Sequence, residues 1–504
     1  MNMNTLKIGW ASRDISTDKP INIPGQFHMR ISQGITDPLT ANVLLIENGS
    51  DIVVFVSIDA VVVRSHLLDE LRAKVFSYTK EIPVEKIILN ATHTHTGASH
   101  YDDSGWWNEL NDIPDSGLKI ASSEAYRAFL STQIAEAILE AYQTRKEGGI
   151  AYGYGYAVVG HSRRVVYFDD TSKRAGGVVN GYMVNGHGVM YGNTADDNFS
   201  HYEAGTDSFV NVMFTFDSTN NLTGAVVNIP CPSQNSEHDV KLSADYWHNI
   251  RSAIREKFGD IYILGQCAAG GDLSPRVLHY KQAQERRFKL KYGGTDRKDF
   301  DERKDIGERV ACAFAEIYGW AKNDIQTELP ITHVVETVNL SKRIITDEEL
   351  DFCTAQLKKL EDRQFSTDTS NPIAMLNHNS ALQAERSRYK EILKRYEEQT
   401  TNPKLPMELH ILRIGDISFA TNRFELYMDF MHRIQARSPF IQTFVIQLTG
   451  VPGTEGGSYL ATERGVESKG YSACMYCTLV SPEGGQELVD ESVRILKEIY
   501  NGGN

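Results

Sequence analysis

The sequence has 504 residues, of which 41% are hydrophobic and 23% charged, and its formal net charge is −14 at pH 7. No apolar run approaches the roughly 18 residues that a membrane-spanning helix needs, which excludes transmembrane helices. The negative charge and the lack of a large basic cluster exclude nucleic acids and anionic lipid surfaces, so we expect a small-molecule, lipid or glycan partner.

The first third of the chain alternates predicted strands and helices. Residues 42–47 and 52–57 are predicted to form two strands around an Asn-Gly turn. Residues 65–79 have the period of an amphipathic helix, and residues 86–90 form a short buried strand. A second long helix is predicted over residues 122–146. This order is typical of an α/β protein.

The middle of the chain continues the same pattern. Residues 210–216 and 223–229 are predicted to form a hairpin across the DSTNN turn. A helix over residues 244–258 and a strand over 261–264 follow, and the strand leads into the small-residue loop GQCAAGGDLSPR. Residues 299–320 again have helical spacing. These elements extend the α/β order.

The last third contains one segment of different composition. Residues 346–396 are rich in Glu, Lys, Arg and Leu and are interrupted near STDTSNP, which predicts a helical hairpin that we interpret as a solvent-facing arm. Alternation returns in ELHILRIGDISFAT and over residues 444–449, and residues 486–500 form a final helix. The predicted fold class is α/β, with mixed β-sheets flanked by helices and a helical hairpin insertion.

The N-terminus and the cysteines indicate the compartment. No basic region followed by an apolar stretch occurs near the start, so we expect a cytoplasmic protein, or an exported one whose leader has been removed. Cys231, Cys267, Cys312 and Cys353 lie in apolar or helical surroundings, which favours buried thiols over disulfides. The lone CxxC at residues 474–477 lacks the second pair of a four-cysteine zinc site, and we assign it to packing.

Two histidines lie two residues apart in NATHTHTGASH, which begins at the end of the predicted strand 86–90. If residues 91–96 stay extended, His93 and His95 point to the same side. Imidazole suits zinc, and zinc brings the pKa of water near neutrality, so one histidine can bind a metal while the other moves a proton. Two hydrogen-bonded loop histidines are the alternative, and the spacing alone does not decide between them.

Four segments spread over the chain match one family in sequence and in order. They are KIGWASRDIST near the N-terminus, THTHTG at residues 92–97, GDLSPR at 271–276 and YLATERGVESKGY at 459–471. Together they resemble the neutral ceramidases and the wider group of proteins that carry their catalytic domain. The resemblance implies a zinc-dependent hydrolase of amide or related acyl bonds. It also implies one catalytic domain over residues 1–504, with residues 346–402 as a helical insertion.

The resemblance implies a metal site built from distant residues. His93 corresponds to a zinc ligand and His95 to the group that handles protons. Glu425, in ATNRFELYMDF, corresponds to a glutamate ligand, although helical spacing by itself is typical of an exposed carboxylate there. Tyr459 and Tyr471 keep the spacing of two family tyrosines, the first on zinc and the second on the substrate carbonyl.

Two further segments are implied to contact the substrate. Ser274 of GDLSPR corresponds to the serine of the family's GDVSPN, which faces the scissile amide, and Asp272 of the same loop is expected to contact the substrate. Such small-residue loops let backbone amides converge on an oxyanion, although a plain turn serine stays an open alternative. Arg163 in GHSRRVVYF corresponds to an arginine of the family's NR motif, and we expect it to stabilise the oxyanion with Tyr471.

The loop PCPSQNSEHDVKL departs from the family. The family's second histidine ligand aligns with Pro232, which cannot bind zinc. We predict that His238 replaces it because a nitrogen donor suits zinc best, with Glu237 as the second choice. Gln234 would bind zinc poorly, and we expect Gln234 and Glu237 to line the substrate site in any case.

Other departures put ceramide itself in doubt. The segment MYGNTADDNFSHYEAGTD does not match closely, and its His201, Glu203 and Asp207 are candidates to line the pocket. Because only one predicted helix follows the Tyr471 segment, we also expect no immunoglobulin-like C-terminal domain of the kind that full-length ceramidases carry. Two alternatives therefore stay open: a glycan-directed enzyme on the same scaffold, which the Trp106-Trp107 pair favours slightly, and a metal-free ligand-binding protein.

Overall fold

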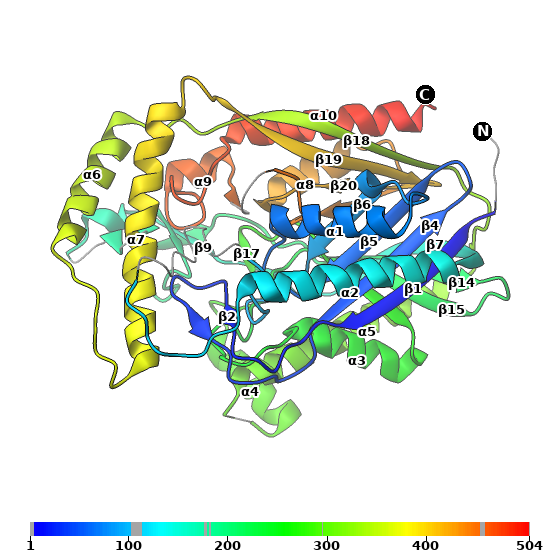
Figure 1. The fold of residues 1–504 in the computed structure, drawn as a ribbon, viewed down its shortest axis with the longest axis horizontal. Coiled ribbons are helices and arrows are strands. Elements are labelled where there is room, and N and C mark those ends of the chain that lie inside the picture. Colours follow the sequence, from blue (N-terminus) through cyan, green and yellow to red (C-terminus); the bar gives the residue numbers. More distant parts are fainter. Residues whose placement is uncertain are drawn as a thin grey trace.

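A mixed eight-stranded sheet runs through the middle of the protein (Figure 1). The structure is a computed structural model that describes residues 5–101, 113–175, 179–180, 183–294, 296–453 and 459–502. Trp106 and Trp107 lie outside the described residues. Within the described residues the strand order of the large sheet is β16 (Tyr262–Cys267), β15 (Leu222–Ile229), β14 (Phe209–Asp217), β7 (Lys146–Tyr156), β1 (Lys7–Asp14), β4 (Thr40–Glu47), β5 (Ile52–Ile58) and β6 (Ile87–Ala91).

A second, four-stranded sheet packs face to face on the first. Its order is β18 (Ile331–Ser341), β19 (Lys404–Ile414), β20 (Ile417–Thr421) and β22 (Gln442–Ile446). One buried cluster joins the two inner faces and includes Phe55 of the large sheet and Phe419 of the small one, whose ring centroids are 5.0 Å apart. Apolar surface removed from water contributes about 25 cal/mol per Å², so this interface is a major source of stability.

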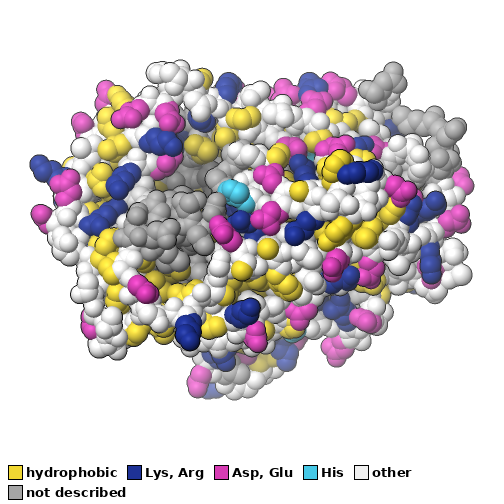
Figure 2. Space-filling model, viewed as in Figure 1, with side chains coloured by type: hydrophobic (Ala, Val, Ile, Leu, Met, Phe, Trp, Pro, Cys, Tyr) yellow, Lys and Arg dark blue, Asp and Glu magenta, His cyan; other side chains and the backbone are white. Residues whose placement is uncertain are grey.

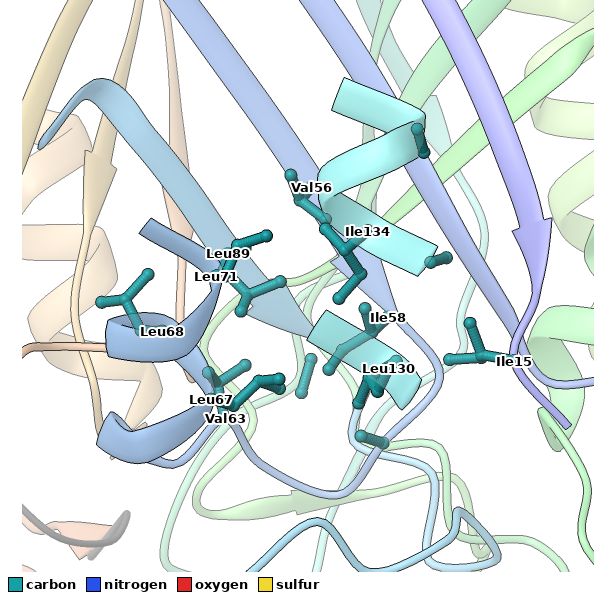
Figure 3. Close-up of a cluster of buried hydrophobic side chains, with 14 of the residues drawn as sticks. Ile15, Val56, Ile58, Val63, Leu67, Leu68, Leu71, Leu89, Leu130 and Ile134 are labelled. Carbon is teal, nitrogen blue, oxygen red and sulfur yellow. The ribbon is translucent and has the colours of Figure 1, made fainter. Parts of the chain in front are cut away.

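Helices cover the outer faces of both sheets. Side chains of α1 (Ser65–Tyr78) and α2 (Ser123–Thr144) meet those of β5 and β6 in one core, and Figure 3 shows Leu71, Leu89, Val56 and Ile134 meeting there. The other covering helices are α3 (Tyr246–Phe258) and α5 (Lys298–Ala321) on the large sheet, and α8 (Met428–Arg437) and α10 (Pro482–Tyr500) on the small one. Strands covered on both faces need near-continuous apolar runs, which explains why the sequence shows them.

The predicted hairpins and helices are confirmed within a few residues. The β4–β5 and β14–β15 pairs are antiparallel, and Gly49 adopts the left-handed conformation (φ 79°) that the first turn requires. The helix predicted over residues 122–146 ends at Thr144, because Lys146 already belongs to β7. Glycines alternate with larger residues in β7. Because glycine has a low strand propensity, the sequence pattern did not predict this strand. A Cβ at Gly153 would lie 2.2 Å from the Trp320 ring, so the glycine makes room for α5.

The helical hairpin is confirmed as α6 (Asp347–Glu361) and α7 (Pro372–Glu398), at the edge of the molecule in Figure 1. It is more than a solvent-facing arm. The backbone N–H of Met29 donates to Ser380 Oγ at 3.0 Å, and the Arg388 guanidinium lies 4.4 Å from the centre of the Phe27 ring. The insertion therefore packs on the N-terminal loop around residues 24–29.

The charged side chains, the cysteines and the helices can be compared with what the composition predicted. Figure 2 shows acidic and basic side chains interspersed over the visible face. The structure shows no disulfide among the described cysteines, and Cys312 is exposed, contrary to the expected buried thiol. No helix within the described residues has the length and apolar character needed to cross a membrane.

Candidate functional site

The histidine motif follows β6, but the chain does not stay extended. His93 has a φ of 65°, in the left-handed region that non-glycine residues rarely adopt. The condition for the predicted same-side geometry, an extended segment over residues 91–96, is therefore not met. The two rings nevertheless lie together, with the centroids of His93 and His95 4.9 Å apart and their planes at 79°. A strained backbone held by its surroundings is a frequent feature of functional sites.

His93 is fixed between two acceptors. Its Nδ1 lies 2.5 Å from the backbone oxygen of Val61, and its Nε2 lies 3.2 Å from Glu425 Oε2. A carbonyl and a carboxylate can only accept hydrogen bonds, so the neutral imidazole satisfies one contact and not both. The contact therefore needs a proton or a metal ion shared between Nε2 and the carboxylate.

Glu425 occupies a short strand and not a helix. The strand β21 (Glu425–Leu426) pairs in parallel with β23 (Tyr459–Leu460), which makes Glu425 and Tyr459 direct partners. The exposed carboxylate that helical spacing allowed is wrong, because only 16% of the Glu425 side chain is accessible. Burial would raise the pKa of Glu425, but His93, Arg163 and Tyr459 outweigh it and lower that pKa below its ordinary value.

Arg163 links several predicted site residues. Its Nη2 donates to Tyr459 Oη at 3.2 Å and lies 3.7 Å from Glu425 Oε2, and its Nη1 donates to Gln234 Oε1 at 3.1 Å. The side chain is buried. Burial opposes its charge, yet Tyr459, Tyr191 and Glu425 keep the pKa of Arg163 above its ordinary value. The guanidinium is therefore a permanent positive charge inside the site.

The two tyrosines lie against each other, and Tyr459 contacts Arg163. The ring centroids of Tyr459 and Tyr471 are 5.7 Å apart in an edge-to-face arrangement, and Tyr471 also meets Phe27 edge-to-face at 5.3 Å. Burial, together with Glu425, raises the pKa of both phenols well above the ordinary value. Both hydroxyls are neutral donors in the absence of a bound cation.

Ser274 and Asp272 lie on the loop that packs against Glu425. A Cβ at Gly271 would lie 2.3 Å from the Glu425 carbonyl oxygen, so only glycine permits this approach. Ser274 belongs to β17 (Leu273–Ser274), which pairs with β8 (His161–Ser162) beside Arg163. The Asp272 carboxylate accepts from the backbone N–H of Met428 at 3.1 Å, and burial raises its pKa to about 6.

His95 lies next to His93, with 13% of its side chain accessible. Its Nδ1 lies 3.1 Å from the Gly25 carbonyl, so Nδ1 carries the proton of the neutral ring. The Nε2 atom is buried and has no hydrogen-bond partner among the described residues. Burial first, and then His93, Arg30 and Arg163, hold the pKa of His95 well below its ordinary value. The ring is neutral at pH 7 and presents a free lone pair.

In the described part of the loop after Pro232, Gln234 and Glu237 contact site residues and His238 does not. Gln234 reaches Arg163, as described above, and Glu237 Oε2 lies 3.8 Å from His95 Nδ1. The His238 side chain is 75% exposed, and its Nε2 lies 3.5 Å from Glu237 Oε1. A contact of His238 with His93 or Glu425 does not occur in the described structure, and its role as a ligand stays a prediction.

The three residues predicted from the unmatched segment do not contact His93 or His95 in the described part of the chain. His201 is exposed and contacts Ser200, whereas Glu203 is buried in a two-point ion pair with Arg164 at 2.7 and 2.8 Å. Asp207 Oδ2 lies 2.9 Å from His432 Nε2. Among the described residues, none of the three forms a hydrogen bond or ion pair with Arg163, Glu425 or Tyr459, and a substrate role for His201 stays a prediction.

Three contributors were missed by the sequence patterns. Tyr191 Oη donates to Ser274 Oγ at 3.4 Å and accepts from the Gln234 side chain. Arg30 donates to the His95 carbonyl at 2.6 Å. Arg276 pairs with Glu237 at 2.6 Å. Two of the three could have been found from the sequence: Arg276 replaces the asparagine that ends the motif GDVSPN, and Tyr191 belongs to the segment that does not match the family.

The set of possible metal donors is small. No group of three or more His, Cys, Asp or Glu side chains within the described residues is placed to hold a metal ion. His93 and Glu425 supply a nitrogen and a carboxylate oxygen that face each other, and a phenol oxygen is the third donor type in the cluster. These are chemically compatible with zinc, provided that the tyrosine ionises.

Comparison with solved structures identifies the fold. The neutral ceramidase from Pseudomonas aeruginosa superimposes with a TM-score of 0.64 at 16% identity, over 100% of this chain and 75% of that one. The chain has the neutral ceramidase fold. A ceramidase complexed with C2 gives a TM-score of 0.63 at 15% identity, over 99% and 76% of the two chains. Neither a protein-family model nor a curated protein matches the sequence.

The neutral ceramidase fold confirms the predicted class, with mixed sheets flanked by helices. Identity this low establishes the fold alone, since one fold serves many chemistries. Within it, His93, His95, Arg163, Glu425 and Tyr459 lie together although they come from distant parts of the sequence.

Proposed function

We propose that the protein is a metal-dependent hydrolase that cleaves an amide or related acyl bond, with zinc as its metal. The observation that carries the proposal is the 3.2 Å approach of His93 Nε2 to Glu425 Oε2 beside Arg163 and Tyr459. Two acceptors facing one imidazole need a shared cation or proton, and the motif resemblance favours a metal there.

The residues that would hold the metal are His93, Glu425 and Tyr459. The Nδ1 contact of His93 with Val61 fixes the tautomer that leaves Nε2 free for a metal, which is the usual arrangement around metal-bound histidines. When bound, zinc supplies Lewis-acid chemistry, lowering the pKa of water and polarising a carbonyl. Three protein donors and one open position are typical of catalytic zinc sites.

His95 is suited to proton transfer. A general base must be unprotonated at the working pH and must have a lone pair within reach of the reacting group. The ring is neutral because burial and neighbouring positive charges lower its pKa, and its buried Nε2 has no partner among the described residues. We assign proton removal and its later return to this nitrogen.

Arg163 and Tyr471 are suited to stabilise negative charge that develops on a carbonyl oxygen. Arg163 is buried and held by Gly271, Gln234 and Tyr459, so its charge is oriented before substrate arrives. The protonated Tyr471 hydroxyl can donate a hydrogen bond. Preorganised donors of this kind contribute about 10²–10³-fold each to turnover. Ser274 would orient the scissile bond.

The test is product release by zinc-loaded protein. N-acyl substrates, including N-acyl sphingoid bases, should release fatty acid, and the His93→Ala variant should not. His432→Ala, which alters a partly exposed histidine paired with Asp207, is the control and should keep the activity. Release of reducing sugar from glycosides with no fatty acid would reject the proposal in favour of the glycan-directed alternative. Equal activity of His93→Ala and wild type would reject the assigned site.

A further inference from the structure

Three guanidinium groups gather around the candidate site. Arg163 lies 3.7 Å from Glu425, and Arg276 lies 2.6 Å from Glu237. Arg30 donates to the His95 carbonyl. Arg30 and Arg163 are 5% and 2% exposed. Buried charges are costly unless the protein compensates them, so these two buried groups are committed to contacts within the protein.

Arg30 is held by backbone carbonyls, with the carboxylates of Glu237 and Asp239 close enough to favour its charged form. It donates to four backbone carbonyls, those of Glu237, Asp239, Pro24 and His95, at 2.5, 2.8, 3.1 and 2.6 Å. Burial lowers the pKa of Arg30 to about 10, which still leaves it charged at pH 7. The carbonyls engage its two terminal nitrogens, whereas its buried Nε has no hydrogen-bond partner among the described residues.

Arg276 is the guanidinium that a ligand can reach. Its side chain is 29% exposed, and its Nη1 lies 2.6 Å from Glu237 Oε1. Its Nη2 donates weakly to the Gln234 carbonyl at 3.5 Å, and its guanidinium lies 5.5 Å from the centre of the Tyr191 ring. A guanidinium has five N–H donors, and these contacts engage two of them. The remaining donors are available to a ligand.

The position of Arg276 relative to the reacting bond is fixed. Its backbone N–H donates to Ser274 Oγ at 3.1 Å, and Tyr191 contacts both the Ser274 hydroxyl and the Arg276 side chain. Glu237 holds the Arg276 guanidinium on one side and lies beside His95 on the other. A substrate group that Arg276 binds would therefore lie close to the scissile bond that Ser274 would face.

We infer that the substrate carries an oxyanionic group, a carboxylate or a phosphate, which Arg276 binds through the donors that Glu237 and Gln234 leave free. The inference deepens the proposed function and rests on it for the location of the scissile bond. The planar guanidinium matches both oxyanions with two parallel hydrogen bonds, which an asparagine at this position cannot provide. An N-acyl compound with an anionic amine part fits, and uncharged ceramide does not.

The experiment compares matched ligands that differ in one charge. N-octanoylglycine carries a carboxylate, N-octanoylglycinamide is its neutral counterpart, and N-octanoylethanolamine phosphate supplies the other oxyanion. Dissociation constants are measured by calorimetry on the metal-free protein, and kcat/KM on the zinc-loaded protein. At least one anionic ligand should bind about 10-fold or more tightly than the neutral one, the range expected for a charged hydrogen-bonded contact. Comparing the two anionic ligands identifies the oxyanion.

Variants separate recognition from folding. Arg276→Asn should bring the anionic and neutral ligands within about 2-fold of each other, and Arg276→Lys should keep part of the preference because it keeps the charge. Arg276→Asn combined with Glu237→Gln removes both members of the ion pair and should also lose the preference. Arg255→Gln, on the surface of α3, is the matched control and should behave as wild type.

The outcomes distinguish the two claims. Equal binding of charged and neutral ligands by wild type, or an unchanged preference in both Arg276→Asn variants, overturns the inference. A preference that depends on Arg276 without hydrolysis of any ligand supports anion recognition and counts against the proposed hydrolase. Hydrolysis of the neutral ligand at the same kcat/KM as the anionic ones keeps the hydrolase and rejects Arg276 as a specificity residue.

Discussion

His93 Nε2 and Glu425 Oε2 lie 3.2 Å apart although 332 positions separate the two residues in the chain. His93 follows the edge strand of the large sheet, and Glu425 follows β20 of the small sheet. The contact therefore exists only because the two sheets pack face to face. The candidate chemistry at this contact depends on that packing, and the predictions below test its parts.

The two histidines of the motif should behave differently when replaced. His93→Ala should lose metal and activity together, because it removes a proposed ligand. His95→Ala should keep most of the metal and lose about 10²–10⁴ in turnover, the usual contribution of a general base. Metal content by atomic absorption and turnover on one N-acyl substrate check this. Equal metal loss in both variants would make His95 a ligand.

The loop after Pro232 decides the number of metal ligands. His238 is largely exposed and Glu237 is held by Arg276, so we expect His238→Ala and Glu237→Ala each to change zinc affinity by less than about 10-fold. The site would then have three protein donors. Competition with a chelator at fixed pH measures the affinity. A larger loss in His238→Ala alone would show that the loop moves to supply the replacement ligand predicted from the sequence.

A glycine beside His95 offers a paired test of positioning. Gly25 has a φ of 104°, and a Cβ there would lie 2.8 Å from His95 Nδ1. Gly34 has a similar φ of 119°, but a Cβ there would meet nothing within 4 Å. Both alanine variants carry the same kind of backbone strain. Gly25→Ala should lower kcat well beyond Gly34→Ala at unchanged metal content, and equal kcat values would contradict the role of this contact.

Arg164 should be important for stability and for the placement of Tyr471. It forms a buried ion pair with Glu203 and also donates to the Tyr471 carbonyl at 2.9 Å. Arg164→Met leaves Glu203 buried without its partner, which costs about 3–5 kcal/mol in free energy of unfolding. Urea denaturation measures the change. Arg174→Met, which removes surface ion pairs with Asp169 and Asp196, should cost much less, and equal losses would contradict this assignment.

Two buried histidines between the sheets should make the fold sensitive to acid. His333 Nε2 lies 2.9 Å from His410 Nδ1, and His410 Nε2 lies 3.0 Å from Glu408, which also pairs with Arg72. Burial lowers the pKa of both histidines; Lys86 and Arg72 lower that of His333 further, whereas Glu408 partly offsets the effect at His410. The unfolded chain then binds more protons than the folded one as pH falls below about 6.5.

Stability from this pair is therefore present above pH 6.5 and is lost as pH falls below it, by up to about 1.4 kcal/mol per pH unit for each histidine. The double variant His333→Leu/His410→Leu should show a smaller loss of the free energy of unfolding between pH 7 and pH 5. Urea titrations at several pH values check this. Parallel curves for wild type and variant would show that these histidines do not govern the acid response.

Much of the fold was predictable from local patterns. The apolar runs of β4, β5 and β6 and the period of α1 and α3 follow from burial on one or both faces, which local sequence records directly. The strand β7 was missed because its glycines serve a tertiary contact with α5. The extended course expected for residues 91–96 was wrong, because the surroundings hold His93 in a left-handed conformation that propensity does not predict.

The sequence by itself determined the chemistry that is available, and the tertiary structure decided how it is combined. The motifs supplied His93, His95 and Ser274 as candidates because their residue types and order resemble one family. Spacing along the chain says nothing about distances between remote segments, so only the packing of the sheets brought Glu425 to His93 and left His238 at the surface. The surroundings of Arg276 are likewise built from side chains of several segments, which no single stretch of sequence contains.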